Sequence, residues 1–293
     1  MTSMPGSSQT DAADSADELP PLSAEGATCY RFETPNPLDV SVRNQAGSVE
    51  ITAADVTETS VEIVPNDSRG AELAERTRVQ LSENAGRLRI DVPDRRMLRQ
   101  PSLEIIVTVP TGSSVDVETA TADVQTRGVL DSATVTTASA DVSLSHVSGR
   151  LEVTSASGDI HVGRGEGPVR VRTASGDVRL DESMTEASVQ TASGDVLIGR
   201  LMGELTSRSA SGDVIIGSAA AGSVQAKTMS GDVIVGVASG LLLWLDVNSL
   251  SGEVDSQLGP ERTTNPDAGA DREPDLRITA STMSGDVLLR RGR

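Results

Sequence analysis

A tetrapeptide with the pattern Ser-Gly-Asp-Val, or a close variant of it, returns at a constant spacing along this chain. Its acidic residue stands 18 residues after the previous one at each of six successive positions, namely Asp123, Asp141, Asp159, Asp177, Asp195 and Asp213. Three further copies follow at wider intervals, with acidic residues at Asp232, Glu253 and Asp286. A fixed period is the signature of a chain built from one repeated supersecondary unit. The repeat therefore limits the architecture to a stack of similar units.

Each unit contains two short strands on either side of a turn. Apolar and polar residues alternate over residues 169–173 and again over residues 177–180, and Ala-Ser-Gly lies between the two stretches. Alternation with a period of two is typical of strands that have one buried face. Glycine in the connecting segment allows a backbone conformation that other residues disfavour. Helical spacing fits none of the units.

One such unit cannot bury its apolar face alone, but stacked units bury a continuous column of Val, Leu and Ile. We therefore predict an all-β fold, a parallel β-solenoid with 18-residue coils. A triangular solenoid of three hexapeptide turns is the alternative, and it requires inward residues six positions apart. Here the inward positions form two pairs separated by seven residues, as from Val171 to Val178. This spacing favours a flattened solenoid.

The repeat divides the chain into three parts. Residues 1–30 are rich in Ser, Asp, Ala and Pro, and we expect a disordered tail. Residues 31–110 are predicted to form irregular β coils, and residues 111–293 the regular solenoid. An acidic segment rich in Pro, Asp and Gly, residues 259–274, is expected to leave the last coil as a loop.

The irregular part repeats the strand–turn–strand spacing in a looser form. Residues 40–51 and 79–90 both show it, and residues 103–109 form a further strand before Pro-Thr-Gly. Between the two looser units we predict one short helical insertion that begins at Ser68.

Charge and composition exclude several classes of partner. The chain has 43 acidic and 25 basic side chains, a formal net charge of −18, and only 1% aromatic residues. Nucleic acid would be repelled, and stacking platforms for bases or sugars are scarce. The longest apolar stretch, around residues 241–245, is too short to insert into a membrane, and no export signal is apparent at the start. We therefore expect a cytoplasmic protein, and a single cysteine, Cys29, excludes an internal disulfide.

The repeated carboxylates are the candidate metal ligands. Stacking places Asp141, Asp159, Asp177, Asp195 and Asp213 in one row, about one strand spacing apart. Neighbouring charges at that distance repel by roughly 1 kcal/mol when hydrated, so some interaction must offset the repulsion. We expect hydrogen bonds from turn amides to do so. The alternative is that calcium binds between the coils, because carboxylates are hard oxygen ligands.

The remaining polar residues show no catalytic constellation, and we predict no catalytic or cofactor-binding residue. His146 and His161 occupy different positions within adjacent coils and lack a neighbouring nucleophile. Arg170, Arg172 and Arg179 form the one basic cluster on the rod, which we interpret as a solvated strand face, with contact to an acidic glycan as the alternative. Polysaccharide-cleaving β-helix enzymes use a local pair of carboxylates, whereas here the carboxylate recurs in every coil.

Several of these segments together resemble a known family. They are the repeated Thr-Ala-Ser-Gly-Asp-Val units, the opening Phe-Glu-Thr-Pro at residues 32–35, the strand over residues 103–110, and the late Trp-Leu-Asp-Val at residues 244–247. The chain resembles the β-strand-repeat "putative adhesin" proteins, a domain-of-unknown-function family common in actinobacteria. The resemblance implies a parallel β-solenoid and carries over no site residues.

These observations predict a non-enzymatic scaffold or protein-interaction module, adhesin-like in form, with an unidentified protein partner. A polysaccharide-active β-helix enzyme and a rod stabilised by divalent cations are the alternatives. Trp244 and its leucine neighbours are expected to pack under the C-terminal coils as a cap, with a partner-binding patch as the alternative, because the end of a solenoid exposes strand edges.

Overall fold

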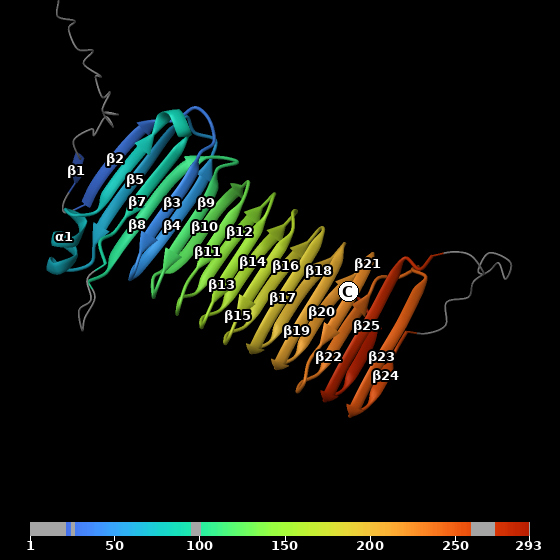
Figure 1. The fold of residues 1–293 in the computed structure, drawn as a ribbon. Helices are drawn as coiled ribbons and strands as arrows, with labels where there is room; N and C mark the ends of the chain where they lie inside the picture. The colour runs from blue at the N-terminus through green and yellow to red at the C-terminus, as the bar shows by residue number, and fades with distance from the viewer. Residues whose placement is uncertain (1–21, 25–26, 95–100, 259–272, 293) are drawn as a thin grey trace, which may run out of the picture.

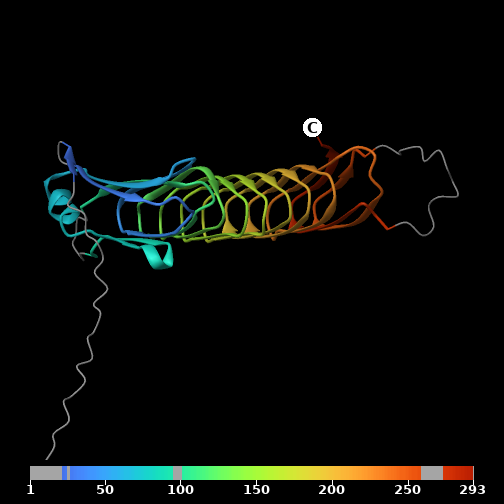
Figure 2. The same cartoon turned by 90° about the horizontal axis from the view of Figure 1, so that it is seen from above.

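Two long sheets face each other and form a rod (Figures 1 and 2). The computed structural model describes residues 22–24, 27–94, 101–258 and 273–292. Strands account for 67% of the structure and helix for 4%, so the predicted all-β solenoid is confirmed. Most neighbouring strands are parallel, and the chain adds one strand to each sheet as it completes a coil.

The first sheet, sheet A, has 14 strands. In spatial order they are β1 (Leu22–Ala24), β2 (Ala27–Glu33), β5 (Glu58–Pro65), β8 (Leu103–Pro110), β4 (Gly47–Ala54), β10 (Asp123–Leu130), β12 (Val142–Val147), β14 (Ile160–Gly165), β16 (Val178–Ser183), β18 (Val196–Leu201), β20 (Val214–Ala219), β22 (Val233–Val237), β26 (Val287–Arg291) and β24 (Val254–Ser256).

The second sheet, sheet B, has 12 strands. Their spatial order is β23 (Leu243–Ser251), β25 (Leu276–Ser284), β21 (Gly222–Lys227), β19 (Glu204–Ser211), β17 (Glu186–Ser193), β15 (Val169–Thr173), β13 (Leu151–Ser155), β11 (Ala133–Thr136), β9 (Ser114–Thr119), β3 (Asp39–Asn44), β7 (Arg87–Asp91) and β6 (Arg78–Ser82).

The register between coils explains the period of 18. In sheet A, Val178 pairs with Val196, and in sheet B, Leu151 pairs with Val169, so each residue lies beside its equivalent in the next coil. The inward residues of both sheets meet in one apolar core and are almost completely buried. Since the coil has two strand-bearing sides, the flattened solenoid is confirmed. A layer this thin is filled by Val, Leu, Ile and Ala, which explains why few aromatic residues are needed.

The N-terminal part departs from a parallel solenoid. Strands β1, β2, β5 and β8 pair antiparallel with one another, and β6 and β7 form an antiparallel hairpin around a 3-10 turn, Glu83–Ala85. The interpretation of residues 79–90 as a coil was therefore wrong, because both strands lie in the same sheet. Helix α1 (Ser68–Ala74) begins where predicted, and the Asp67 side chain accepts a hydrogen bond from the Gly70 amide at 2.6 Å.

The predicted disordered tail ends too late. Residues 22–24 and 27–30 belong to strands β1 and β2, and residues 1–21 and 25–26 lie outside the described residues. Most of the predicted acidic loop, residues 259–272, also lies outside them.

The order of coils at the C-terminal end differs from the order along the chain. The coil formed by β25 and β26, the last in sequence, lies between the coil of β21 and β22 and the coil of β23 and β24. The strands of residues 243–256 are therefore the outermost coil of the rod, at the end opposite to α1 (Figure 1). Trp244 lies on the outer face of β23 over the Arg277 guanidinium, 4.8 Å from the ring centre, and does not pack under the coils as expected.

Candidate functional site

The repeated aspartates form one continuous ladder along the rod. The backbone amide of each one donates to Oδ1 of the aspartate in the preceding coil, at 2.9 Å from Asp159 to Asp141 and at 2.8 Å from Asp195 to Asp177. The ladder runs from Asp123 through Asp141, Asp159, Asp177, Asp195, Asp213, Asp232 and Asp286 to the amide of Glu253. The predicted role of turn amides as partners of these carboxylates is confirmed.

This geometry explains why the turn carries Gly before Asp. Gly194 has a φ of +121°, and a Cβ placed on it would lie 2.3 Å from the carbonyl oxygen of Gly176 in the preceding coil. Only glycine avoids both the strained backbone and the collision. The motif is therefore explained by coil stacking alone.

The five candidate metal ligands lie in the expected row, but each carboxylate already has a backbone partner. Among the residues that the structure describes, no three His, Cys, Asp or Glu side chains gather closely enough to hold a metal ion. Successive carboxylates of the ladder are separated by a whole strand spacing, about 4.8 Å, and the outermost coil carries glutamate in place of aspartate.

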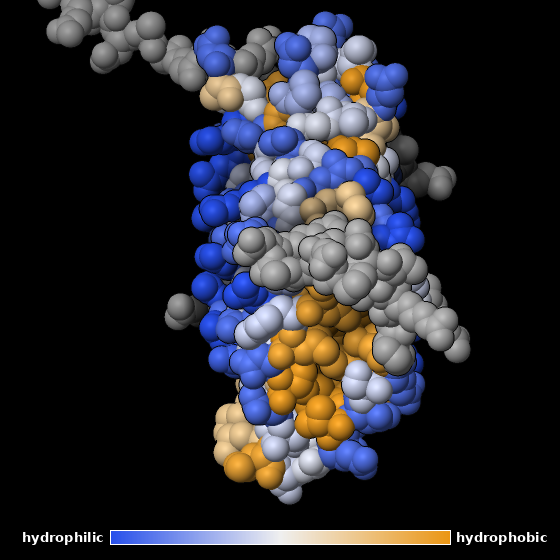
Figure 3. Space-filling view, turned by 90° about the vertical axis from the view of Figure 1, so that its right-hand side faces the viewer, coloured by the Kyte–Doolittle hydropathy of each residue, from blue (hydrophilic) through white to orange (hydrophobic). Residues whose placement is uncertain are grey.

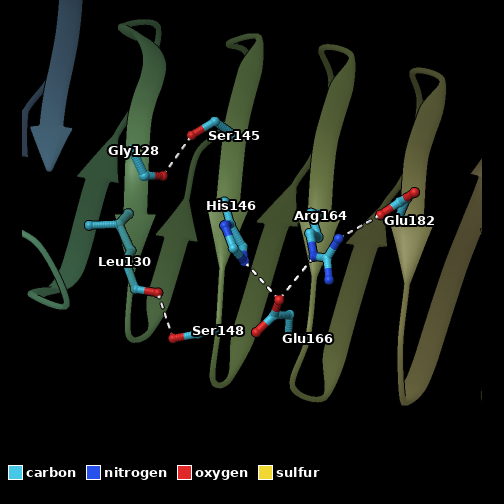
Figure 4. Close-up of polar contacts among 8 residues, drawn as sticks. All are labelled: Gly128, Leu130, Ser145, His146, Ser148, Arg164, Glu166 and Glu182. Atoms are coloured by element: carbon cyan, nitrogen blue, oxygen red, sulfur yellow. Dashed lines mark hydrogen bonds and ion pairs between the residues drawn. The ribbon is translucent and has the colours of Figure 1, made fainter.

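A second polar network joins three coils on sheet A near its β12 edge (Figure 4). Arg164 contacts Glu166 at 2.9 Å and Glu182 at 3.0 Å, and the His146 ring lies 3.2 Å from Glu166. The hydrogen bond from Arg164 lowers the pKa of Glu166 more than any other contact, and the contact with His146 adds to the effect. The network thus stabilises an ionised carboxylate, which suits an ion-pair role better than acid catalysis.

The other histidine has a similar role. The His161 ring lies 2.9 Å from Asp181, which also accepts from Arg179 at 2.7 Å. Burial raises the pKa of Asp181, but the hydrogen bonds from the two cations outweigh burial, so the pKa is lowered overall. Neither histidine lies in a pair with a serine or cysteine nucleophile in these contacts.

The predicted arginine cluster is not brought together. Arg170 and Arg172 lie on β15 in sheet B, whereas Arg179 lies on β16 in sheet A, and all three point outward. Because the outer faces of the two sheets look in opposite directions, the three guanidinium groups cannot bind one anion.

A shallow polar hollow lies on the outer face of sheet B near its N-terminal end. It has a volume of about 420 Å³, and its charged lining consists of Asp39, Asp116, Arg87 and Arg89. Arg87 lies 3.7 Å from Asp39. The lining contains no aromatic ring that could stack on a sugar.

Comparison with known proteins identifies the family. The model of the Toastrack DUF4097 family matches residues 38–290. The chain belongs to this family. No curated protein matches the chain.

Among solved structures, this Toastrack chain is similar to a "putative adhesin" from Bacteroides fragilis, at 12% identity and a TM-score of 0.43, over 91% of this chain and 98% of the other. A "putative adhesin" from Parabacteroides distasonis matches at 12% identity and a TM-score of 0.40, over 89% and 96%. A "putative lipid binding protein" from the same species matches at 12% identity and 0.32, over 90% and 97%. Likenesses this distant carry no argument about what the chain binds.

The described helices of the Toastrack chain include none with the length and apolar character needed to cross a membrane.

Sequence reasoning missed an apolar stripe on the outer face of sheet A. Leu197, Ile215, Ile234 and Leu288 pair in register across four adjacent coils, each partly exposed. In the earlier coils the same outward column holds polar or charged residues, namely Gln125, Ser143, His161 and Arg179. The column could have been found by aligning the units on their aspartates, because each member follows its ladder residue by two positions.

The stripe in this Toastrack rod has a distinct border on each side. On one side runs the aspartate ladder. On the other side stand Gly199, Gly217 and Gly236, where a Cβ at Gly217 would come within 2.7 Å of the Gly199 carbonyl oxygen. Close coil packing therefore explains the glycines, and their small size leaves the adjoining stripe open from that side. The arrangement offers a flat apolar surface beside a row of negative charge.

Proposed function

We propose that this chain is a non-enzymatic β-solenoid that serves as a scaffold and protein-interaction module, with the apolar stripe of sheet A as its contact surface. The observation that carries the proposal is the change of one outward column from polar residues in the early coils to Leu197, Ile215, Ile234 and Leu288 in the later ones. Outward positions on a solvated sheet are usually polar, and contiguous apolar surface marks sites of interaction.

The neighbouring charges define the chemistry of the partner. Four strands at about 4.8 Å spacing give the stripe a length of roughly 15–20 Å, and the carboxylates of Asp195, Asp213 and Asp232 run parallel to it. A protein partner with apolar side chains flanked by Lys or Arg would bury the stripe and face the ladder with opposite charge. Such complementarity would speed association and reject acidic partners.

Photo-crosslinking in the native cell tests this proposal. A photoreactive residue at Ile215 is compared with the same residue at Gln125, which occupies the same column in the polar coils. We expect a discrete protein adduct at Ile215 that is absent at Gln125 and that disappears when Ile234 is changed to Lys. Equal labelling at the two positions, or an adduct unaffected by Ile234→Lys, would refute the stripe as the contact surface.

The enzymatic alternative has a definite place to be tested. The polar hollow on sheet B holds the one group of carboxylates in a concave surface among the pockets described above, yet Asp39 is ion-paired with Arg87. A retaining or inverting glycosidase needs a pair of carboxylates free to act as acid and as nucleophile or base. Turnover of any acidic or neutral glycan that is abolished by Asp116→Asn would establish the alternative over the scaffold.

Two further proposals rest on the sequence. The excess of arginine over lysine and the family resemblance support an actinobacterial source, and the absence of an apparent export signal supports a cytoplasmic location. Fractionation of the native organism with an antibody against the rod tests the location.

A further inference from the structure

Exposed large hydrophobic side chains gather at the C-terminal end of the rod. Of the eight such residues in the described part of the chain, seven belong to the last three coils in space or the turns beside them, and Met202 is the exception. The seven are Met229, Leu242, Trp244, Leu245, Leu250, Val254 and Met283. Figure 3 shows apolar surface concentrated at this end. We call the outer surface of the coil formed by β23 and β24 the C-terminal pole.

The pole is a cross-section of the core left open. Leu245 pairs in register with Ile278 and Val254 with Val287, and the latter two are completely buried. Leu245 and Val254 occupy the same inward positions one coil further out, yet they are 42% and 46% exposed. Their exposure arises because no described residue continues the stack beyond them.

The opposite pole is closed. At the N-terminal end, inward residues such as Val61 and Ile63 are fully buried, and Leu73 of helix α1 packs into the same core cluster. Solenoids need such end structures because an open coil exposes both apolar surface and unpaired strands. The two ends of this rod are therefore different in kind.

Strand edges accompany the apolar section at the C-terminal pole. Strand β23 pairs only with β25, and β24 only with β26, so each is the last strand of its sheet in the described structure. Both sheets thus end at the same pole with a free row of backbone donors and acceptors. Free edges of this kind are templates for pairing with another chain.

We propose that a second copy of this chain covers the C-terminal pole, so that two rods join end to end across a two-fold axis. A single extended peptide would pair with one sheet edge and leave the other edge and the section between them open. A second C-terminal pole presents two edges and an apolar section of the same outline. Because the N-terminal pole offers no such section, the contact is pole to identical pole, and it closes as a dimer without extending into a fibre.

The dimensions and charges of the pole define how this dimer behaves. Strand β23 has nine residues, about 30 Å, and two packed sheets with their outer side chains are about 20 Å thick, which gives about 600 Å² per copy. The total, about 1,200 Å², is at the lower end for specific interfaces. The outermost coil carries Asp246, Glu253 and Asp255 and no basic residue. Like charges therefore face each other around the apolar section, and salt strengthens the dimer by screening them.

Mass and shape measurements on the full chain test the proposal. Light scattering after size-exclusion chromatography should give twice the monomer mass of 30.4 kDa as the concentration rises into the micromolar range, and more dimer at 0.5 M than at 0.05 M NaCl. Small-angle X-ray scattering should show a longest dimension nearly doubled. Trp244 is the only tryptophan, so its fluorescence emission should shift to shorter wavelength over the same concentration range.

Matched substitutions place the contact. Val254→Lys should raise the dimer dissociation constant at least tenfold, and so should Leu250→Lys, whose side chain is 79% exposed and can be changed without disturbing the core. Met202→Lys, 44% exposed but distant from the pole, should leave it unchanged. A chain that stays monomeric at 200 µM and 0.5 M NaCl would overturn the proposal. So would a dimer of unchanged length, or one weakened equally by all three substitutions. Dimerisation that salt weakens would indicate a different surface and would also overturn it.

Discussion

The aspartate ladder makes a quantitative prediction at Asp177, whose Oδ1 accepts from the Asp195 amide at 2.8 Å. Two substitutions separate the two effects that act on this carboxylate. Asp177→Asn retains an oxygen acceptor but removes the charge, whereas Asp177→Ala removes both. The charge relief is common to both variants, so the difference in their stability isolates the hydrogen bond.

The magnitudes follow from the spacing of the coils. Two neighbouring carboxylates about 4.8 Å away each repel Asp177 by roughly 0.9 kcal/mol at full hydration, so both variants gain at most about 1.7 kcal/mol. A neutral hydrogen bond contributes about 1 kcal/mol, and a charged acceptor somewhat more. We therefore expect Asp177→Asn to be as stable as the wild type or more stable, and Asp177→Ala to be about 1 kcal/mol less stable than Asp177→Asn.

Denaturant unfolding and amide hydrogen exchange measure this difference globally and locally. The Asp195 amide should exchange about fivefold faster in the alanine variant than in the asparagine variant, which corresponds to about 1 kcal/mol. The Asp159 amide, which donates to Asp141 two coils away, should be unaffected and serves as an internal control. If the alanine variant equals or exceeds the asparagine variant in both measurements, the ladder does not stabilise the stack.

Four other predictions concern the core, the turns, the ion pairs and metal binding. Leu180→Ala, in the middle of the core, should cost about 2–5 kcal/mol in the free energy of unfolding. Gly194→Ala should cost more than Gly240→Ala in the same assay, because both glycines have positive φ but only Gly194 would collide with the preceding coil. The lowered pKa values of Glu166 and Asp181 mean that both carboxylates stabilise the fold above their ordinary pKa and lose this contribution as pH falls through the lowered values. Unfolding between pH 7 and 3 should therefore show decreasing stability below about pH 5, with a shallower decrease in Glu166→Gln. Millimolar calcium should leave the melting temperature where chelator leaves it, because the ladder carboxylates already accept backbone hydrogen bonds; a rise of several degrees would restore the cation-stabilised rod.

The period of 18 was sufficient to predict the regular coils because it reports a nearest-neighbour interaction. When Val178 pairs with Val196, the same residue types meet again in the next coil, so one aligned column describes a whole sheet. The spacing of seven between Val171 and Val178 also predicted two opposed faces correctly. These features depend only on local alternation and on stacking of identical units.

The candidate sites were less accessible to the same reasoning. Sequence spacing placed Arg170 and Arg179 within one unit, but it did not show that they lie on opposite faces, because the turn between them carries the chain from one sheet to the other. The apolar stripe was overlooked for the converse reason. Leu197 and Ile215 lie beside inward-facing neighbours in sequence, so they read as part of the core until the pleat assigns them to the outer face.

The ends of the rod are where a repeat carries least information, and both departed from expectation. The hairpin of β6 and β7 has the spacing of a coil, but it folds back within sheet B. At the other end, β25 pairs with both β21 and β23, so the last coil in sequence lies inside the outermost one. Identical coils are interchangeable as neighbours, so pairing energy alone hardly distinguishes the two orders. The inserted order places Leu276, Ile278 and Leu289 in the buried interior and leaves Ser256 at the outermost position that corresponds to Leu289. Burying the more apolar coil is the favourable choice, and the same choice leaves the less complete coil at the pole, where a second copy would have to complete it.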